Sequence, residues 1–258
     1  MRKSKGNALA FLVAALILYT ILEVAIFSKP ASATYYVTGT EVWENEEKVL
    51  SEDVVIDGGE LIIRNCKITF SGVEIRNDGK LTIINSRIGF PYSVKVERGT
   101  ISISGSYVRL ESNLVIDSGT LNITGSSTIS IQEEVSINVK GGYAYIYDST
   151  LTTGGYVWYF KQGTGADLEI EKTTLNRAHI DSSLQQNKIV IRNSVINCSA
   201  CVITAESESA YCEVTHCKFD NVTVLAIYGG FVQITDCQFY SGSELKIDNA
   251  SGLSLIHI

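Results

Sequence analysis

A short alternating pattern of apolar and polar positions recurs along this chain at steps of 20 to 24 residues. Residues 79–88 show it most clearly: Leu81 and Ile83 flank one polar position, Asn85 and Ser86 follow, and Ile88 closes the unit. Nine copies align on the polar position, at Asn65, Asn85, Gly105, Gly125, Asp148, Lys172, Asn193, His216 and Asp236. A fixed period in this range indicates stacked supersecondary units.

A second short alternating strand follows each early copy and ends at a glycine. Examples are 73–75, 94–96, 114–116 and 135–137, which end at Gly79, Gly99, Gly119 and Gly141. Units this short leave no room for a crossover helix, so the pattern predicts an all-β solenoid whose coils pair in parallel. Period-2 alternation then points the apolar pair of each copy inward. In the fourth copy Thr128 replaces the next apolar residue, which predicts a one-residue bulge there.

These repeats resemble those of the right-handed parallel β-helix family, the pectin-lyase-like fold. The resemblance covers residues 35–252 and implies about nine coils of 20 to 24 residues. Parallel crossovers are almost always right-handed, which favours the same hand. Members of the family include polysaccharide lyases, glycosidases, adhesins and passive surface proteins, so the fold by itself does not give a function.

The first 33 residues are typical of a secretory signal peptide that is cleaved near Ala33. Arg2, Lys3 and Lys5 precede an apolar run over 8–27, and Ala31-Ser32-Ala33 gives a small-residue cleavage pattern. The run forms an N-terminal apolar helix of nearly membrane-spanning length, so an uncleaved anchor and a pilin-type leader are alternatives. All three predict a secreted or cell-surface protein that meets a membrane only through this segment. We expect residues 35–52 to cap the solenoid.

The last six residues, 253–258, resemble the in-frame translation of a transposon-end adaptor used in sequencing libraries. A native terminal strand is the alternative. The first interpretation makes residues 34–252 the natural solenoid and predicts that the chain is a C-terminally truncated fragment. We therefore exclude 253–258 from functional reasoning.

Composition limits the classes of partner. A net charge of −7 argues against nucleic acid, which binds basic surfaces. With three His and one Met we expect no cofactor and no metal, although Cys198, Cys201, Cys212, His216 and Cys217 could be read as a zinc cluster. In an exported protein Cys198, Cys201, Cys217 and Cys237 are instead disulfide candidates, of undetermined pairing.

Outward positions of copies five to eight carry the candidate binding site. Copies three and four have small polar residues there, whereas copy five has Tyr143, Tyr145 and Tyr147. The predicted ligand-binding residues are Tyr145, Tyr147, Glu169, Glu171 and Arg192. Aromatic rings beside carboxylates and a guanidinium suit a sugar. Alternatively Glu171 and Arg192 form only a surface ion pair, or the patch mediates self-assembly.

Two classes of function remain open. The chain is either a structural, adhesive or polysaccharide-binding surface module, or a polysaccharide lyase or glycoside hydrolase. Glu169 and Glu213, with Arg192, are the catalytic candidates. We expect Glu169 and Glu213 to lie two coils apart, at a distance of about 9.6 Å. This distance is at the wide edge of the separation between the two carboxyl groups of inverting glycosidases. The motifs of catalytic β-helix families are absent from this sequence, so an enzyme would need residues from a missing C-terminal part. A further aromatic set, Tyr156, Trp158 and Phe160, is expected to point outward on another side.

Overall fold

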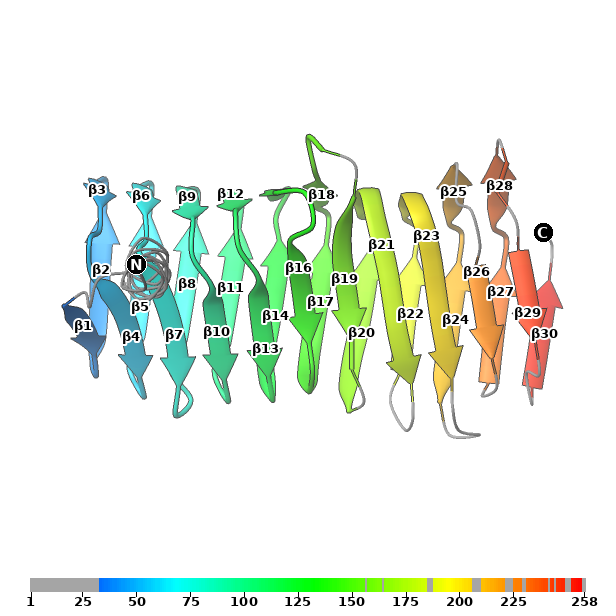
Figure 1. The fold of residues 1–258 in the computed structure, drawn as a ribbon, viewed down its shortest axis with the longest axis horizontal. Helices are drawn as coiled ribbons and strands as arrows, with labels where there is room; N and C mark the ends of the chain where they lie inside the picture. Colours follow the sequence, from blue (N-terminus) through cyan, green and yellow to red (C-terminus); the bar gives the residue numbers. More distant parts are fainter. Residues whose placement is uncertain are drawn as a thin grey trace, which may run out of the picture. The chain divides into compact units, whose positions relative to one another are not determined.

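The computed structural model in Figure 1 is a parallel β-solenoid. It describes residues 33–258 except 156, 164, 185–187, 206–209, 221–224, 229–230, 241, 244, 249–251 and 257–258. Every described element is a strand, as predicted. The expected N-terminal helix and export segment lie outside the described residues. Within the described ranges, no helix has the length and apolar character needed to cross a membrane.

The repeated pattern forms one parallel sheet of eleven strands, which runs the length of the solenoid. Its members are β2(Thr40–Glu44), β5(Glu60–Arg64), β8(Lys80–Ile84), β11(Thr100–Ser104), β14(Gly119–Thr124), β17(Gly142–Tyr147), β20(Ala166–Glu171), β22(Lys188–Arg192), β24(Tyr211–Thr215), β27(Phe231–Thr235) and β30(Gly252–Ile256). The nine predicted copies are β5 to β27, so one strand precedes them and one follows.

The other nineteen strands form a second sheet made of two ladders. The ladder after the polar turn contains β3(Glu47–Val49), β6(Lys67–Thr69), β9(Arg87–Phe90), β12(Tyr107–Leu110), β15(Thr128–Ile131), β18(Thr150–Thr152), β25(Lys218–Asp220) and β28(Gln238–Tyr240). The next ladder contains β1(Thr34–Val37), β4(Asp53–Asp57), β7(Gly72–Arg76), β10(Val94–Glu97), β13(Leu114–Asp117), β16(Ser136–Val139), β19(Trp158–Gln162), β26(Leu225–Tyr228) and β29(Leu245–Asp248). Two long strands, β21(Thr174–Leu184) and β23(Val195–Ala205), belong to both.

The core is a stack of apolar side chains along the solenoid axis, as the period-2 pattern predicts. All nine inward pairs, from Leu61 and Ile63 to Val232 and Ile234, are buried. The next apolar position is also buried from Ile68 to Phe219, and Phe239 packs against the core while partly exposed. Burial of this kind contributes about 25 cal/mol per Å².

The predicted outward orientation of Trp158 and Phe160 is wrong. Both side chains are fully buried, and the outward residue between them is Tyr159. Trp158 lies in register with Ala178, where a small residue leaves room for the indole, and its Nε1 donates to the Asn176 carbonyl at 2.9 Å. Tyr156 lies outside the described residues.

The polar turn position has a structural role in every copy. All nine residues from Asn65 to Asp236 have φ between 47° and 64°, the left-handed region that Asn, Asp and Gly tolerate best. The extra residue of the fourth copy lies in this turn rather than at Thr128, because Ser126 is left-handed as well. Thr128 itself pairs in register with Tyr107. A register shift that the sequence did not predict occurs in β21 at Arg177, where φ is 56°.

The small Ser, Cys or Thr after each turn forms hydrogen bonds with backbone groups at the point where the chain changes direction. Ser86 is representative: its hydroxyl donates to the Ile84 carbonyl at 2.7 Å and accepts the Cys66 N–H at 3.0 Å. Cys66 and Ser106 repeat both contacts in their own coils. An unpaired buried N–H would be costly there, which explains the restriction to small hydrogen-bonding residues.

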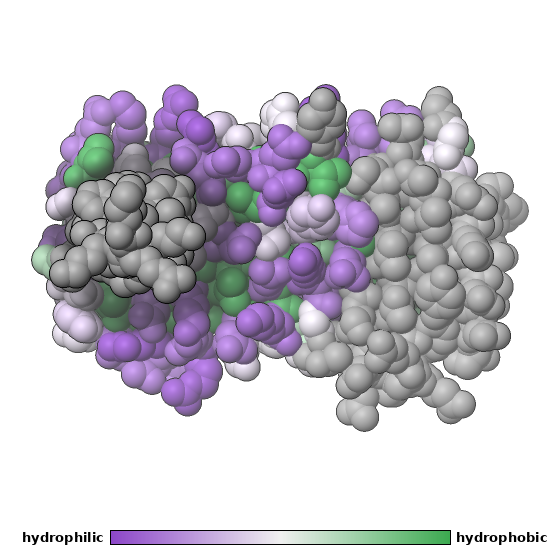
Figure 2. Space-filling model, viewed as in Figure 1, coloured by the Kyte–Doolittle hydropathy of each residue, from purple (hydrophilic) through white to green (hydrophobic). Residues whose placement is uncertain are grey.

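The segment predicted to cap the solenoid is itself a coil. Its strands β1, β2 and β3 pair in register with β4, β5 and β6, and Asn45 has the left-handed turn conformation. At the other end, β30 pairs in register with β27. On the side formed by β4, β7, β10, β13 and β16, Figure 2 shows mainly hydrophilic side chains with apolar ones scattered between them.

Candidate functional site

The predicted candidate residues lie together on the outer surface of the eleven-strand sheet, on β17, β20, β22 and β24. Their columns follow the predicted register: Tyr145 pairs with Glu169, and Tyr147 pairs with Glu171. One coil further, Glu171 pairs with Arg192. Each of these strands pairs with a neighbour on both sides, so the sheet holds these side chains in a fixed register.

Three tyrosines, Tyr143, Tyr145 and Tyr147, form a row along β17, which we call the tyrosine row. The Tyr143 and Tyr145 ring centroids are 6.4 Å apart at 9°, and those of Tyr145 and Tyr147 are 6.0 Å apart at 17°. The rings are therefore nearly parallel and spaced by the two-residue repeat of the strand. All three are half-buried, so the row presents partly exposed aromatic surface.

The two ends of the tyrosine row are anchored and its centre is not. The Tyr143 hydroxyl donates to Glu169 Oε2 at 2.9 Å, while Lys172 Nζ lies 2.8 Å from the Tyr147 hydroxyl and 4.9 Å from its ring centroid. Among the described residues, no hydrogen-bond partner contacts the Tyr145 hydroxyl. Tyr145 is thus the ring whose polar end is open to a ligand.

Arg192 forms ion pairs with two carboxylates, neither of which is Glu171. Its Nε and Nη2 lie 2.6 and 2.9 Å from the two oxygens of Glu213, and its Nη1 lies 3.4 Å from Glu169 Oε1. The alternative in which Glu171 and Arg192 form a surface ion pair is therefore not what the described residues show. The guanidinium instead leans across Val190, which occupies an outward position between the two glutamates and is only 3% exposed.

These contacts continue into a chain that runs along the solenoid axis. The Tyr211 hydroxyl donates to Glu213 Oε2 at 2.9 Å, just as Tyr143 donates to Glu169. We call the set Tyr143–Glu169–Arg192–Glu213–Tyr211 the bridge. Charge-assisted hydrogen bonds of this type are the stronger ones in proteins. The bridge fixes the side chains of four successive coils.

The environment holds each shifted group of the bridge in one protonation state at neutral pH. Hydrogen bonding to Arg192 lowers the pKa of Glu213, and the same contact raises the pKa of Arg192. Burial, followed by the hydrogen bonds to Glu169 and Glu213, raises the pKa values of Tyr143 and Tyr211. The bridge therefore keeps neutral tyrosines and an ionised Glu213.

This arrangement does not suit the predicted catalytic pair. An inverting glycosidase needs one carboxyl group with a raised pKa, so that it can act as an acid. Glu213 has the opposite shift, and both Glu213 and Glu169 are occupied by Arg192. Arg192, in turn, directs its Nε, Nη1 and Nη2 atoms at these two glutamates.

One carboxylate on the face is free of such contacts. Among the described residues, no hydrogen bond or ion pair engages the Glu171 side chain, although it lies in register with Tyr147 and Arg192. Asp167, at the other end of β20, accepts the Lys188 N–H at 3.0 Å. Glu171 and the Tyr145 hydroxyl are thus the polar groups of the face available to a partner.

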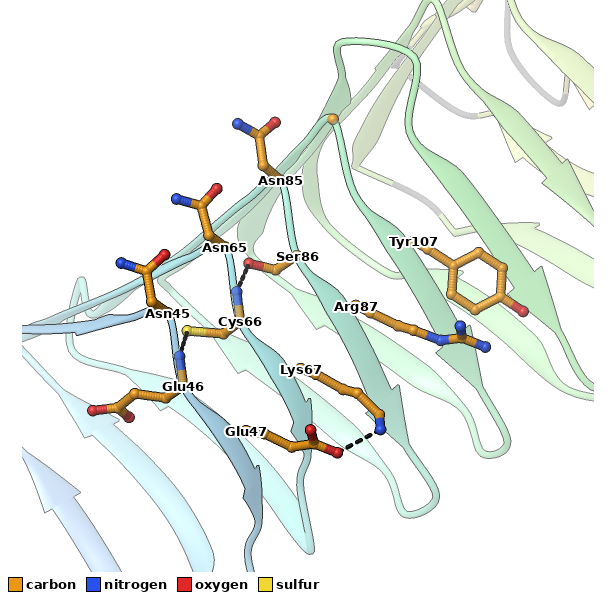
Figure 3. Close-up of a pocket in the computed structure, with 11 residues that line it drawn as sticks. Asn45, Glu46, Glu47, Asn65, Cys66, Lys67, Asn85, Ser86, Arg87 and Tyr107 are labelled. Atoms are coloured by element: carbon orange, nitrogen blue, oxygen red, sulfur yellow. Dashed lines mark hydrogen bonds and ion pairs between the residues drawn. The ribbon is translucent and has the colours of Figure 1, made fainter.

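A separate groove lies at the turn edge of the first coils, about 610 Å³ in volume (Figure 3). It is lined by Asn45, Glu46, Glu47, Asn65, Cys66, Lys67, Asn85, Ser86, Arg87, Gly105 and Tyr107. Its charges are largely engaged: Lys67 pairs with Glu47, and Arg87 lies 5.0 Å from the Tyr107 ring centroid. The asparagines stand in a row because the left-handed turn favours them, so we assign the groove no ligand.

The cysteine assignments have mixed outcomes. Cys66, Cys217 and Cys237 are free, buried thiols, and Cys212 is buried in the core. Cys217 donates to the Thr215 carbonyl at 3.2 Å and Cys237 to the Thr235 carbonyl at 3.4 Å, and contact with Cys237 together with burial raises the pKa of Cys217. The described residues contain no group of three or more metal-ligating side chains. The side chains of Cys198 and Cys201 lie outside the described set, so their pairing stays a prediction.

Two participants of the site were missing from the predicted residues. Tyr211 closes the bridge, and Lys172 anchors Tyr147. Tyr211 could have been found from the sequence, since it starts a strand in the same outward column as Tyr143. Lys172 occupies a turn position, and alternation gives no orientation for a turn side chain.

Comparisons with known proteins add little. No protein-family model matches the sequence, and no curated protein sequence matches it significantly. Among solved structures, the chain is similar to the crystal structure of PfbA, a surface adhesin of Streptococcus pneumoniae, with 10% identity over 88% of this chain and 86% of that chain. The TM-score is 0.25, which carries no argument about function. The solenoid assignment rests on the strand pairing above, and the relationship to pectin-lyase-like proteins stays a prediction.

Proposed function

We propose that this chain is an exported, surface-displayed β-solenoid module that binds a polysaccharide or cell-surface glycan through the tyrosine row. The observation that carries the proposal is the set of three nearly parallel, half-exposed rings beside the free Glu171 carboxylate. Sugar rings offer apolar C–H faces to aromatic side chains and hydroxyl donors to carboxylates. A rigid sheet holds these groups in place, which reduces the entropy lost on binding.

A catalytic role receives less support from the same geometry. The lyase or glycoside hydrolase alternative needs a carboxyl group or base that is free to exchange protons. The bridge engages Glu169, Arg192 and Glu213 with one another, so the described face lacks such a group at these positions. An enzyme would require catalytic residues from elsewhere in the protein.

The test replaces Tyr145 and Tyr147 together with alanine in the full chain. We expect the Tyr145→Ala, Tyr147→Ala double variant to lose binding to the glycans that the wild type retains on a glycan array. Tyr92→Ala is the matched control, because Tyr92 is an exposed tyrosine between two strands of the other sheet. Unchanged glycan binding by the double variant would refute the assigned site.

The same samples separate binding from self-assembly. Sedimentation of the wild type and the double variant shows whether the tyrosine row joins two copies of the chain. If the variant changes from oligomer to monomer and no glycan binds the wild type, the row is an assembly surface and the proposal fails.

A further inference from the structure

A second aromatic group lies on the same face, beyond the bridge. Tyr211 on β24 and Phe231 on β27 are in register, with ring centroids 5.4 Å apart and an interplanar angle of 4°. Phe231 is 41% exposed, unusual for a large apolar side chain on an otherwise polar face. A stacked cross-strand pair contributes to sheet stability, but that role does not require an exposed outer ring.

The two aromatic groups lie in line along the solenoid axis. Four strand steps separate Tyr143 on β17 from Phe231 on β27, which at about 4.8 Å each gives about 19 Å. This span exceeds one sugar ring and suits several linked sugars. The bridge joins the two groups, because its terminal hydroxyls belong to Tyr143 and Tyr211.

The charges between the two groups favour an uncharged ligand. The outward positions carry the four carboxylates Asp167, Glu169, Glu171 and Glu213 against the two cations Lys188 and Arg192, and the turns after β17 and β20 add Asp148 and Lys172. Arg192 forms ion pairs with two of the carboxylates, Glu169 and Glu213, and Glu171 has no cationic partner among the described residues. An acidic polysaccharide would meet this excess of negative charge, which disfavours its own carboxylates.

From these observations, and resting on the proposed function, we infer that the face from the tyrosine row to Phe231 is one extended site for a neutral oligosaccharide that lies parallel to the solenoid axis. The tyrosine row binds one end of the ligand. The Tyr211–Phe231 pair binds the other end, and the bridge holds the two platforms at a fixed separation.

The test measures affinity as a function of ligand length by isothermal titration calorimetry. The probes are a disaccharide and a hexasaccharide of the same neutral sugar, chosen from the array that tests the proposed function, and a uronic-acid hexasaccharide. We expect the wild type to bind the neutral hexasaccharide more tightly than the disaccharide. Phe231→Ala should weaken hexasaccharide binding about tenfold, or about 1.4 kcal/mol, and leave disaccharide binding unchanged.

Two further variants guard against trivial explanations. Phe231→Leu keeps an apolar side chain at the same place. Like Phe231→Ala, it should lose the tighter binding of the hexasaccharide relative to the disaccharide. Tyr240→Ala removes an exposed aromatic ring from the other sheet and should change neither affinity. Thermal unfolding of each variant confirms that the solenoid is intact.

The outcomes separate the two proposals. If the neutral disaccharide and hexasaccharide bind equally well, or if Phe231→Ala keeps the length advantage, the extended site is refuted while the tyrosine row stands. Equal or tighter binding of the uronic-acid hexasaccharide refutes the neutral ligand class. Failure of every glycan, neutral or acidic, to bind refutes the proposed function, and this inference with it.

Discussion

The side chain of Arg192 contacts other residues than the one that strand pairing places beside it. Strand pairing places it beside Glu171, yet the guanidinium reaches diagonally to Glu169 and Glu213. The diagonal arrangement allows a two-point contact with Glu213, and it covers the apolar Val190. A planar guanidinium favours such paired contacts with a carboxylate.

The Glu213 contact predicts a pH-dependent contribution to stability. Because the pKa of Glu213 is lower in the folded state, its contribution is present above the ordinary glutamate pKa of about 4.3 and is lost as the pH falls through the folded value. Glu213→Gln should reduce the free energy of unfolding by about 1–2 kcal/mol at neutral pH. The difference from wild type should shrink towards pH 3, as measured by urea denaturation at both pH values.

Glu171→Gln is the control for this prediction. Glu171 lies on the same face and, within the described part of the chain, forms no ion pair. Its substitution should change the free energy of unfolding little at either pH. A Glu213→Gln effect of the same size at pH 7 and pH 3 would contradict the ionic account of the bridge.

At the residue level, the sequence predicted where each residue lies in its coil better than it predicted which side chains contact one another. The nine turn positions were identified from spacing alone, and each has the left-handed conformation that explains its Asn, Asp or Gly preference. His216 also belongs to the residue types enriched in this region, whereas Lys172 adopts the conformation without such a preference. The bridge could not be predicted, because period-2 alternation fixes the side of a sheet and leaves the rotamer of a long side chain open.

At the level of the strand, β19 shows where alternation misleads. Trp158, Tyr159 and Phe160 are all aromatic, so hydrophobicity alone does not distinguish the two sides of the strand. The decision comes from the neighbouring coils, since Ala178 opposite Trp158 leaves volume that the indole fills. A short, uniformly apolar segment therefore needs information from its partners across the ladder.

Truncation of Trp158 tests this assignment. Trp158→Ala should destabilise the protein by about 3–5 kcal/mol, because it leaves a cavity in the core and an unused backbone carbonyl at Asn176. Tyr159→Ala, one residue away on the outer side, should cost far less. Thermal or chemical denaturation of the two variants gives the comparison, and equal losses would show that the strand is inverted.

At the scale of the molecule, the period predicted the architecture because stacking is local. Each coil pairs only with its neighbours, so nine similar units suffice to define the solenoid. One departure, the extra turn residue at Ser126, makes that coil one residue longer than its neighbour. The other, the register shift at Arg177, is compensated within the same strand pair, because Asn176 with Asn197 and His179 with Ala200 pair at the same offset. The proposed binding face occupies consecutive coils, which the same strand pairing holds together.

The most direct measurement for the whole account is hydroxyl-radical footprinting of the full chain with and without the neutral hexasaccharide. Side-chain oxidation, read by mass spectrometry, reports which aromatic rings the ligand covers. The account predicts that Tyr145, Tyr147 and Phe231 are protected together, while Tyr92 and Tyr107 are unchanged. Protection at Tyr107 in the groove, or no protection on β17, would contradict the assignment of the binding face.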